Sequence, residues 1–276
     1  MRQEGYFKLK GEDFFERRWE PLGEIRCHLV LLHGYGEHCA RYEHTANTLN
    51  ARGIMVHSFD QRGFGRSPGK RAYIREFDVL LDDLDAYLAH VRPRFEDKPW
   101  FMMGHSMGGM VLAAYAETHP LDARGLVFSS PFLALNDDVP KLLLSVAGIL
   151  GKIAPWLPVA GVDNQGLSRD PAIVKAADND PLGYHGWVKA RTGAQFHSAI
   201  ARIQAHFPAI DLPLYIIHGG ADRIVPNIGS RRLHEQCSSA DKSLKIYDGG
   251  YHELWNDIVK EEVIAGIREW ILGRIQ

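Results

Sequence analysis

The sequence predicts an α/β protein with a mostly parallel central sheet, flanking helices and an inserted helical cap. Short apolar runs alternate with longer amphipathic segments along most of the chain, which is typical of strands and helices around a parallel sheet. The alternation stops at about residue 132 and resumes only after about residue 207, an interval too long for a plain loop in a compact domain. The 276 residues therefore predict one domain over residues 1–276, with a cap (lid) at about 132–207.

The first predicted element is an antiparallel pair formed by Phe7 to Leu9 and Phe14 to Trp19, because a turn-forming Gly-Glu-Asp sequence separates them. Further strands are predicted at short apolar runs, which lie at residues 27–32, 54–59, 100–103, 125–129, 214–218 and 244–247. Helices are predicted where apolar residues recur with helical spacing, at residues 42–52, 77–91, 107–119, 228–237 and 256–272. Gly53 and Pro120 favour the ends of two of these helices.

The composition is that of an ordinary globular protein, with 45% hydrophobic and 24% charged residues. Lys and Arg number 32 against 34 Asp and Glu, so the basic surplus of a nucleic-acid-binding protein is missing and no nucleic-acid partner is expected. Cys27, Cys39 and Cys237 are widely spaced and form no CxxC pair, which argues against a disulfide framework or a zinc site. The start of the chain has no apolar run typical of a secretory signal, and a cytoplasmic location is predicted.

The strongest chemical signal is the sequence GHSMG, in which Ser106 lies between an apolar strand and an apolar helix. A GxSxG motif in this context is typical of a nucleophile elbow, a tight turn that exposes the serine hydroxyl at the start of the helix. Gly104 and Gly108 lack side chains and so allow neighbouring backbone to pass close to the turn. We therefore predict that Ser106 is a nucleophile.

A serine nucleophile needs a base, and the base needs an orienting acid. Asp222 and His252 each follow the end of a predicted strand, at the sheet edge where open α/β folds build their sites. Their order after Ser106 is that expected of this fold, which predicts Asp222 as the acid and His252 as the base. His218 lies before Asp222 and breaks that order, and His105 is expected to point away from the site.

An ester hydrolase also needs two donors for the oxyanion that develops on the carbonyl oxygen. The backbone N–H of Met107, the residue after the nucleophile, is one expected donor. The second is expected from the His-Gly-Tyr-Gly loop that follows the first parallel strand, where the glycines allow a turn that aims the N–H of Tyr35 inward. No HExxH or HxxxH spacing indicates a metal site.

Taken together, the motifs resemble the monoacylglycerol lipase and lysophospholipase group of serine α/β-hydrolases. The segments that carry the resemblance are HGYGEHCARY, FDQRGFGRSPGKRAYI, MGHSMGG, SRDP, NDPL, HGGADRIVP and GGYHELWND. It covers about His28 to Glu269 and is weakest between Ala134 and Val162. The resemblance implies an α/β-hydrolase fold with the same site residues: Ser106, Asp222, His252, Tyr35 and Met107.

The resemblance also implies that Glu37 and Arg41 hold the oxyanion loop and approach a glycerol head group. From the residues alone they are equally well interpreted as a surface ion pair. Asp60 and Arg62, which follow a predicted strand, are expected to form a buried structural network rather than a binding site. One departure from the family is Trp255, where some members that act on glycerol esters carry a histidine.

The function implied is hydrolysis of the carboxylic ester of a lipid with one acyl chain, most directly of monoacylglycerol to glycerol and free fatty acid, without a cofactor. A lysophospholipase or a broad carboxylesterase would use the same catalytic residues, so these alternatives stay open. A hydrolase-like binding protein is expected to have lost part of the triad, whereas Ser106, Asp222 and His252 are all present. The lipid ester is the expected partner, and the sequence indicates no oligomeric state.

The first half of the cap is unusually apolar. Leu142 to Gly151 contains no charged residue, and Ile153, Trp156 and Leu157 follow. This composition favours a lid, Leu142 to Val159, that contacts a membrane or micelle, and the alternative is a helix packed on the core. The protein is accordingly expected to bind lipid surfaces peripherally through its cap.

Overall fold

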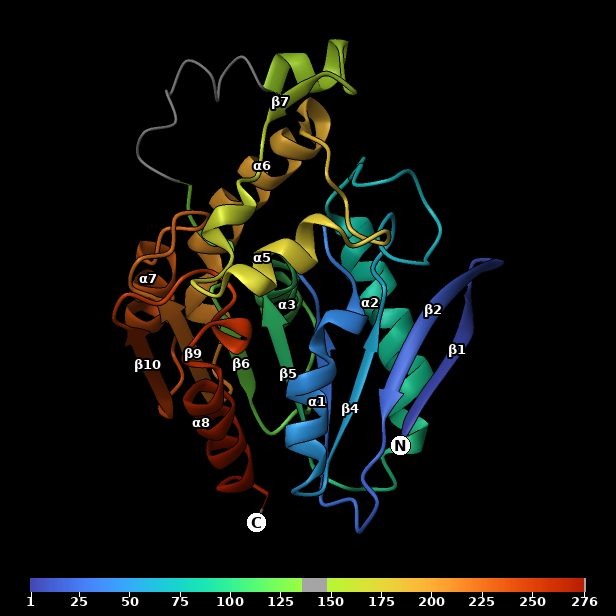
Figure 1. Cartoon of the computed structure of the whole chain (residues 1–276), viewed down its shortest axis with the longest axis vertical. Coiled ribbons are helices and arrows are strands. Elements are labelled where there is room, and N and C mark those ends of the chain that lie inside the picture. Colours follow the sequence, from blue (N-terminus) through green and yellow to red (C-terminus); the bar gives the residue numbers. More distant parts are fainter. Residues whose placement is uncertain (136–147, 276) are drawn as a thin grey trace.

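The computed structural model describes residues 1–135 and 148–275, and its centre is an eight-stranded sheet with the strand order β1-β2-β4-β3-β5-β6-β9-β10 (Figure 1). The strands are β1 (Arg2–Leu9), β2 (Glu12–Trp19), β3 (Cys27–Leu32), β4 (Ile54–Phe59), β5 (Trp100–His105), β6 (Leu126–Ser129), β9 (Leu214–Gly219) and β10 (Lys242–Tyr247). Strand β2 runs antiparallel to both of its neighbours, β1 and β4, and the other five pairings of the sheet are parallel. The predicted mostly parallel sheet, and with it the fold class, is confirmed.

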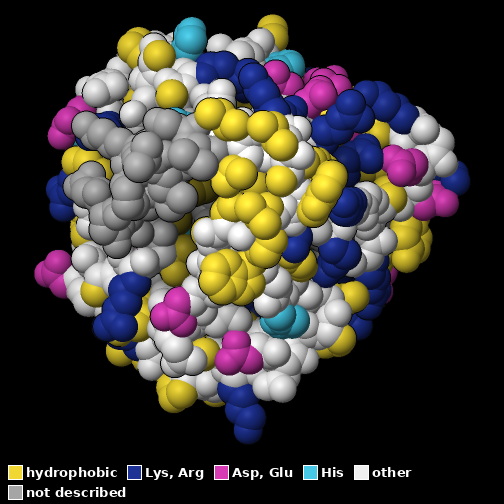
Figure 2. Space-filling view, turned by 90° about the horizontal axis from the view of Figure 1, so that it is seen from above, with side chains coloured by type: hydrophobic (Ala, Val, Ile, Leu, Met, Phe, Trp, Pro, Cys, Tyr) yellow, Lys and Arg dark blue, Asp and Glu magenta, His cyan; other side chains and the backbone are white. Residues whose placement is uncertain are grey.

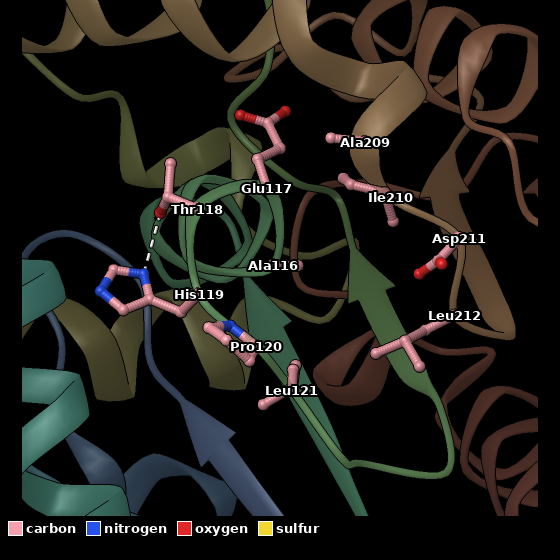
Figure 3. A pocket seen from close by; sticks show the side chains of 10 residues that line it. All are labelled: Ala116, Glu117, Thr118, His119, Pro120, Leu121, Ala209, Ile210, Asp211 and Leu212. Carbon is pink, nitrogen blue, oxygen red and sulfur yellow. Dashed lines mark hydrogen bonds between the residues drawn. The ribbon is translucent and has the colours of Figure 1, made fainter.

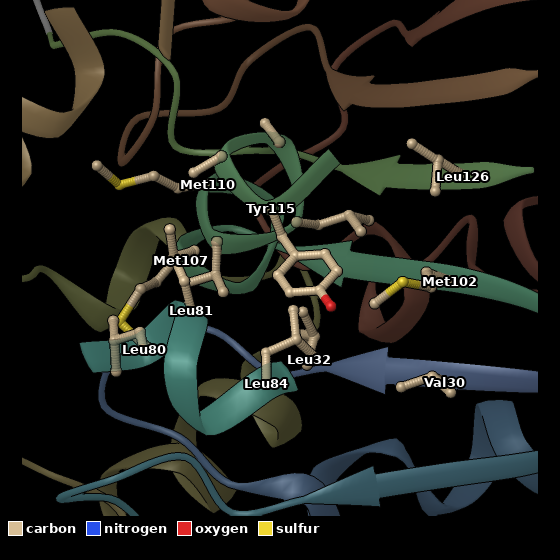
Figure 4. Packing of buried hydrophobic residues seen from close by; sticks show 14 of the residues in the cluster. Val30, Leu32, Leu80, Leu81, Leu84, Met102, Met107, Met110, Tyr115 and Leu126 are labelled. Carbon is tan, nitrogen blue, oxygen red and sulfur yellow. The ribbon is translucent and has the colours of Figure 1, made fainter. Parts of the chain in front are cut away.

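The inner strands are apolar because helices cover both faces of the sheet. Every residue of β3, β4 and β5 is buried, as expected for parallel strands that have no solvated face. Helices α1 (Glu43–Asn50) and α8 (Lys260–Leu272) pack on one face. Helices α2 (Asp78–Val91), α3 (Met107–Thr118) and α7 (Ile228–Gln236) belong to the apolar cluster on the other face. Figure 4 shows Leu84 of α2 and Tyr115 of α3 beside side chains of β3 and β5.

The chain between β6 and β9 lies above the carboxyl ends of the parallel strands (Figure 1). Its described part contains helical residues 148–153, the helices α5 (Pro171–Asp178) and α6 (Ala190–His206), and the strands β7 (Pro158–Ala160) and β8 (Val188–Lys189). The pairing of β7 with β8 was not expected in a cap predicted to be helical. The first part of the predicted lid, residues 142–147, lies outside the described residues.

Two predicted helices, at residues 42–52 and 77–91, begin one residue later than the sequence indicated, and a third, at residues 256–272, begins four residues later. In place of a helix from residue 42, Cys39–Tyr42 form a 3-10 turn and α1 starts at Glu43. In place of a helix from residue 256, α8 starts at Lys260, since the side chain of Asp257 is engaged elsewhere. The Asp257 carboxylate accepts the Tyr251 N–H at 3.0 Å and pairs with Arg169 of the cap at 2.9 Å. The shift of α8 therefore reflects tertiary contacts that local spacing does not encode.

Candidate active site

Ser106 lies in a strained turn between β5 and α3. Its backbone has φ 50° and ψ −115°, a conformation that non-glycine residues rarely adopt. The turn is crowded by backbone: a Cβ atom on Gly104 would come within 2.4 Å of the Gly108 carbonyl oxygen, and one on Gly108 within 2.3 Å of the Leu32 carbonyl oxygen. The two glycines of the motif are therefore required for the turn that holds the serine at the N-terminus of α3.

Asp222 and His252 are joined by a short hydrogen bond above the ends of β9 and β10. The Nδ1 atom of His252 lies 2.7 Å from Oδ2 of Asp222. The other carboxylate oxygen, Oδ1, accepts the backbone N–H groups of Ile224 and Val225, each at 2.9 Å. Ser106 and His252 line the same cavity. The fold thus gathers the predicted nucleophile, acid and base although they lie far apart in the sequence.

The electrostatic surroundings suit a carboxylate that orients a basic imidazole. Burial opposes charge on Asp222, but the bonds from His252 and His218 outweigh it and hold the pKa of that carboxyl well below its ordinary value. Burial also lowers the pKa of His252, yet Asp222, together with Glu253 and Glu37, outweighs this effect and leaves that pKa above its ordinary value. The base is therefore expected to titrate above the pH at which an exposed histidine does.

The predicted oxyanion donors border the same cavity. Tyr35 and Met107 both line it beside Ser106. Met107 is the first residue of α3, a position whose N–H has no partner within its own helix. The loop that carries Tyr35 lies against the nucleophile, because a Cβ atom on Gly34 would be only 3.2 Å from Cβ of Ser106. The Tyr35 side chain is anchored away from the turn, and its hydroxyl donates to the Ala72 carbonyl at 3.1 Å.

Glu37 and Arg41 form a buried network rather than a surface ion pair. Glu37 accepts the backbone N–H of Gly34 and, at 2.8 Å, the hydroxyl of Tyr42. Arg41 lies 3.3 Å from Glu37 and donates to both carboxylate oxygens of Glu253 at 2.8 and 2.6 Å. Burial and the nearby Glu253 carboxylate raise the pKa of Glu37 to about 7. The network joins the oxyanion loop to the residue that follows His252.

The cavity has a volume of about 780 Å³, within the range of small-molecule sites in proteins. Cap and core residues together form an apolar wall, to which Phe132, Leu135, Leu150, Val159, Val188 and Phe196 contribute. The cap is fastened to the oxyanion loop at two points. The Tyr184 N–H donates to the Gly36 carbonyl at 2.8 Å, and His38 lies 2.8 Å from Asp180.

Two histidines set aside in the sequence approach the site. His105 does not point away as expected: its ring lies 4.7 Å from that of His252, centroid to centroid, and it lines the cavity. His218 lies 3.2 Å from the Asp222 carboxylate. Glu253 was also missed, since its partner Arg41 is 212 residues away in the chain. The only signal in the sequence was that Glu253 directly follows the predicted base.

Other residues singled out in the sequence lie behind the site. Trp255 is fully buried and stacks on Tyr42 at 4.0 Å between ring centroids. Asp60 accepts the backbone N–H groups of Cys39 at 2.9 Å and Arg66 at 2.8 Å, so it ties the loop after β4 to the end of the oxyanion loop. These residues support the loops that carry the site and do not line the cavity.

A second cavity, of about 430 Å³, lies at the opposite end of α3 (Figure 3). Because α3 has 12 residues, this cavity is roughly 18 Å from Ser106. It is bordered by Glu117, Thr118 and Asp211. Burial raises the pKa of Glu117 to about 8, and the Thr118 hydroxyl donates to the Ala114 carbonyl at 2.7 Å. No activated nucleophile is found among the residues that line it.

The chain is similar to known proteins over most of its length. The family described as serine aminopeptidase, S33, matches residues 23–258. The chain is 35% identical to the monoacylglycerol lipase of Mycolicibacterium smegmatis, over 93% of this chain and 92% of that protein. The crystal structure of Paleococcus ferrophilus monoacylglycerol lipase is similar with a TM-score of 0.85 and 33% identity, over 95% of this chain and 99% of that one. The crystal structure of a soluble variant of Saccharomyces cerevisiae monoglyceride lipase, in complex with a substrate analogue, is similar with a TM-score of 0.87 and 26% identity. The match covers 99% of this chain and 97% of that one.

Proposed function

The chain belongs to the monoacylglycerol lipase group of the serine aminopeptidase S33 family of α/β-hydrolases, and we propose that it hydrolyses monoacylglycerols to glycerol and free fatty acids. The observation that carries the proposal is the meeting of three features in one cavity: the Ser106 elbow, the Asp222–His252 pair and an apolar wall. An apolar cavity of this volume suits one acyl chain, and the reactive groups lie where the ester would sit.

In the proposed reaction the Ser106 hydroxyl attacks the ester carbonyl while His252 takes its proton. Asp222 holds the imidazole through Nδ1 and stabilises the imidazolium that forms. The backbone N–H groups of Tyr35 and Met107 bind the oxyanion. His252 then gives the proton to the departing glycerol oxygen, which leaves the acyl group on Ser106. Water, activated by His252, attacks this acyl-enzyme, and the fatty acid is released as the serine regains its proton.

We propose that Glu37 and Arg41 form the polar side of the site that faces the glycerol head group. Both residues line the cavity, and the loop that carries Glu37 lies against Ser106. Arg41 can donate to a glycerol hydroxyl, and Glu37 can accept from one. Their mutual contact and the bonds to Glu253 hold the two side chains in place before substrate binds.

The charge of the cavity favours a neutral head group over a phosphodiester. Two arginines line it against five acidic residues: Glu37, Asp163, Asp178, Asp180 and Glu253. Arg41 is already paired with Glu37 and Glu253. A lysophospholipid would bring a phosphate into this acidic surrounding, whereas the glycerol of a monoacylglycerol carries no charge.

We expect the protein to hydrolyse 2-oleoylglycerol at least about tenfold faster, as kcat/KM, than oleoyl lysophosphatidylglycerol, whose head group carries a phosphodiester and no cation. The two substrates share the acyl chain and differ in the head group, and released oleate is measured in mixed micelles of the same detergent. A preference for the lysophospholipid would contradict the proposal and favour a lysophospholipase. Equal rates on both, and on unrelated short esters, would favour a broad carboxylesterase.

We further propose that the cap docks on lipid surfaces. Its described part exposes six large apolar side chains: Ile149, Ile153, Trp156, Leu157, Val162 and Trp187. Figure 2 shows an apolar surface at this end of the molecule with Lys and Arg side chains along one side of it. Lys70, Arg71 and Arg75 are exposed on the loop that borders α6, and Arg191 of α6 donates to the Arg75 carbonyl at 2.6 Å. A surface of this kind suits the boundary between lipid head groups and acyl chains.

Trp156→Glu is expected to lower hydrolysis of vesicle-borne monoacylglycerol roughly tenfold, because a charge replaces a side chain that is 63% exposed and apolar. Hydrolysis of dissolved p-nitrophenyl butyrate should change less than about twofold. Leu22→Glu is the matched control, since Leu22 is 91% exposed on the loop between β2 and β3, outside the cap. Equal losses on both substrates would show that Trp156 supports the fold and not docking.

None of the helices in residues 1–135 and 148–275 has the length and the apolar composition that a membrane-spanning helix requires.

A further inference from the structure

His218 is a second histidine that lies beside the Asp222 carboxylate. It lies in β9, near the carboxyl end of the strand, and is fully buried. Its Nε2 atom is 3.0 Å from the Val225 carbonyl oxygen and 3.2 Å from Oδ2 of Asp222. On the other side of the ring, Nδ1 is 2.7 Å from the hydroxyl oxygen of Ser230 in α7. Both ring nitrogens are therefore engaged, and no polar atom of the side chain is left without a partner.

These contacts determine which nitrogen carries the proton. The Val225 carbonyl can only accept a hydrogen bond, so Nε2 of His218 is the donor. Nε2 also lies 3.2 Å from Oδ2 of Asp222, which likewise can only accept, so this N–H group has two acceptors near it. Nδ1 is left to accept from the hydroxyl of Ser230. The surroundings thus place an N–H group within 3.2 Å of the carboxylate that holds His252.

We propose that His218 is a positioning residue for Asp222, acting on the reaction through the carboxylate and not on the substrate. The proposal rests on the roles proposed above for Asp222 and His252. With His218 in place, Oδ2 lies between two imidazoles, those of His252 and His218. Oδ1 is held by the backbone N–H groups of Ile224 and Val225. A rotation of the carboxylate about its Cβ–Cγ bond would disturb contacts on both oxygens, so the acid has one preferred orientation.

The second imidazole also moderates the bond between Asp222 and His252. A carboxylate that loses one of its donors becomes a stronger acceptor for the donor that remains. Without the His218 N–H, the His252 imidazolium would be held more tightly and would release its proton at a higher pH. The carboxylate would also be less firmly oriented. The other titratable groups near His252 are Glu37, Glu253 and His105. The polar contacts of His218 are with Ser230, Val225 and Asp222, so His218 contacts none of these three groups.

Two amide substitutions separate this role from simple packing. In His218→Gln the side-chain amide reaches the position of Nε2 and keeps an N–H for Asp222. In His218→Asn the amide is one carbon shorter, stays on the Ser230 side and loses that N–H. We expect His218→Asn to lower kcat for monoacylglycerol roughly tenfold or more, with KM changed less than about twofold. The acid limb of its pH profile for kcat/KM should move to higher pH. His218→Gln should keep kcat within about threefold and keep the profile of the unchanged protein.

Equal kcat values and equal pH profiles in the two variants would overturn the proposal. If the asparagine variant does not fold, the unchanged protein provides the test. Long-range ¹H–¹⁵N correlation spectra of the histidine rings should show His218 with its proton on Nε2. A proton on Nδ1 alone would overturn the proposal. If the unchanged protein has the Nε2 proton but does not hydrolyse monoacylglycerol, the proposed function is contradicted. The proposed contact between His218 and Asp222 is not.

Discussion

Replacing Ser106 with alanine is expected to reduce monoacylglycerol hydrolysis by at least about 10⁴-fold and to abolish covalent labelling by a fluorophosphonate. The nucleophile is lost, and the His252–Asp222 pair has no other hydroxyl to activate at the elbow. The fold should persist, because the tight turn depends on Gly104 and Gly108. Alanine can adopt the φ and ψ angles of Ser106 at about the same cost as serine. Labelling is followed on gels, and the thermal unfolding midpoint is followed by circular dichroism.

Ser198→Ala is the matched control, since Ser198 is exposed on α6 of the cap. It should keep normal activity and labelling. Persistent labelling of the Ser106→Ala protein would show that another serine is the nucleophile. A large drop in the unfolding midpoint of that variant would show that the hydroxyl supports the turn, and its activity would then be compared with that of Ser106→Cys, which preserves the volume.

Asp222→Asn is expected to lower kcat by roughly 10⁴-fold while leaving the shape of the site intact. The backbone N–H groups of Ile224 and Val225 both point at the oxygen Oδ1. In the asparagine variant the amide oxygen must stay there to accept them, so the NH₂ group faces His252. Two donors cannot bond each other, and Nδ1 of His252 must then accept, which moves the imidazole proton to Nε2. The imidazole can no longer take the proton of Ser106.

Asp248→Asn is the control for this variant, because Asp248 also follows the end of a strand and is exposed. Initial rates with monoacylglycerol are measured for both proteins at equal concentration. We expect Asp248→Asn to keep rates within about twofold of normal. Near-normal rates in Asp222→Asn together with an inactive Asp248→Asn or Asp211→Asn would show that a different carboxylate orients the base.

The fold class and the family could be predicted from the sequence because their signals are local. Inner strands of the parallel sheet, such as β3 and β5, are almost continuously apolar, and the helices between the strands carry one apolar face, so each element shows its own pattern. Ser106 was indicated by its place between such a strand and helix. Asp222 and His252 could be singled out because the carboxyl ends of parallel strands meet at one edge of the sheet, whatever the distance between them in the chain.

The tertiary structure alone decided which side chains support those residues. Glu37, Arg41 and Glu253 form one buried network, yet Arg41 and Glu253 are 212 residues apart and no spacing rule relates them. His218 was set aside because of its place in the chain order, although it lies only four residues before Asp222, and the packing of α7 against β9 brings the Ser230 hydroxyl to its Nδ1 atom. The physical reason is that such contacts depend on how whole elements pack, whereas the periodicity of a strand or helix depends only on its own residues.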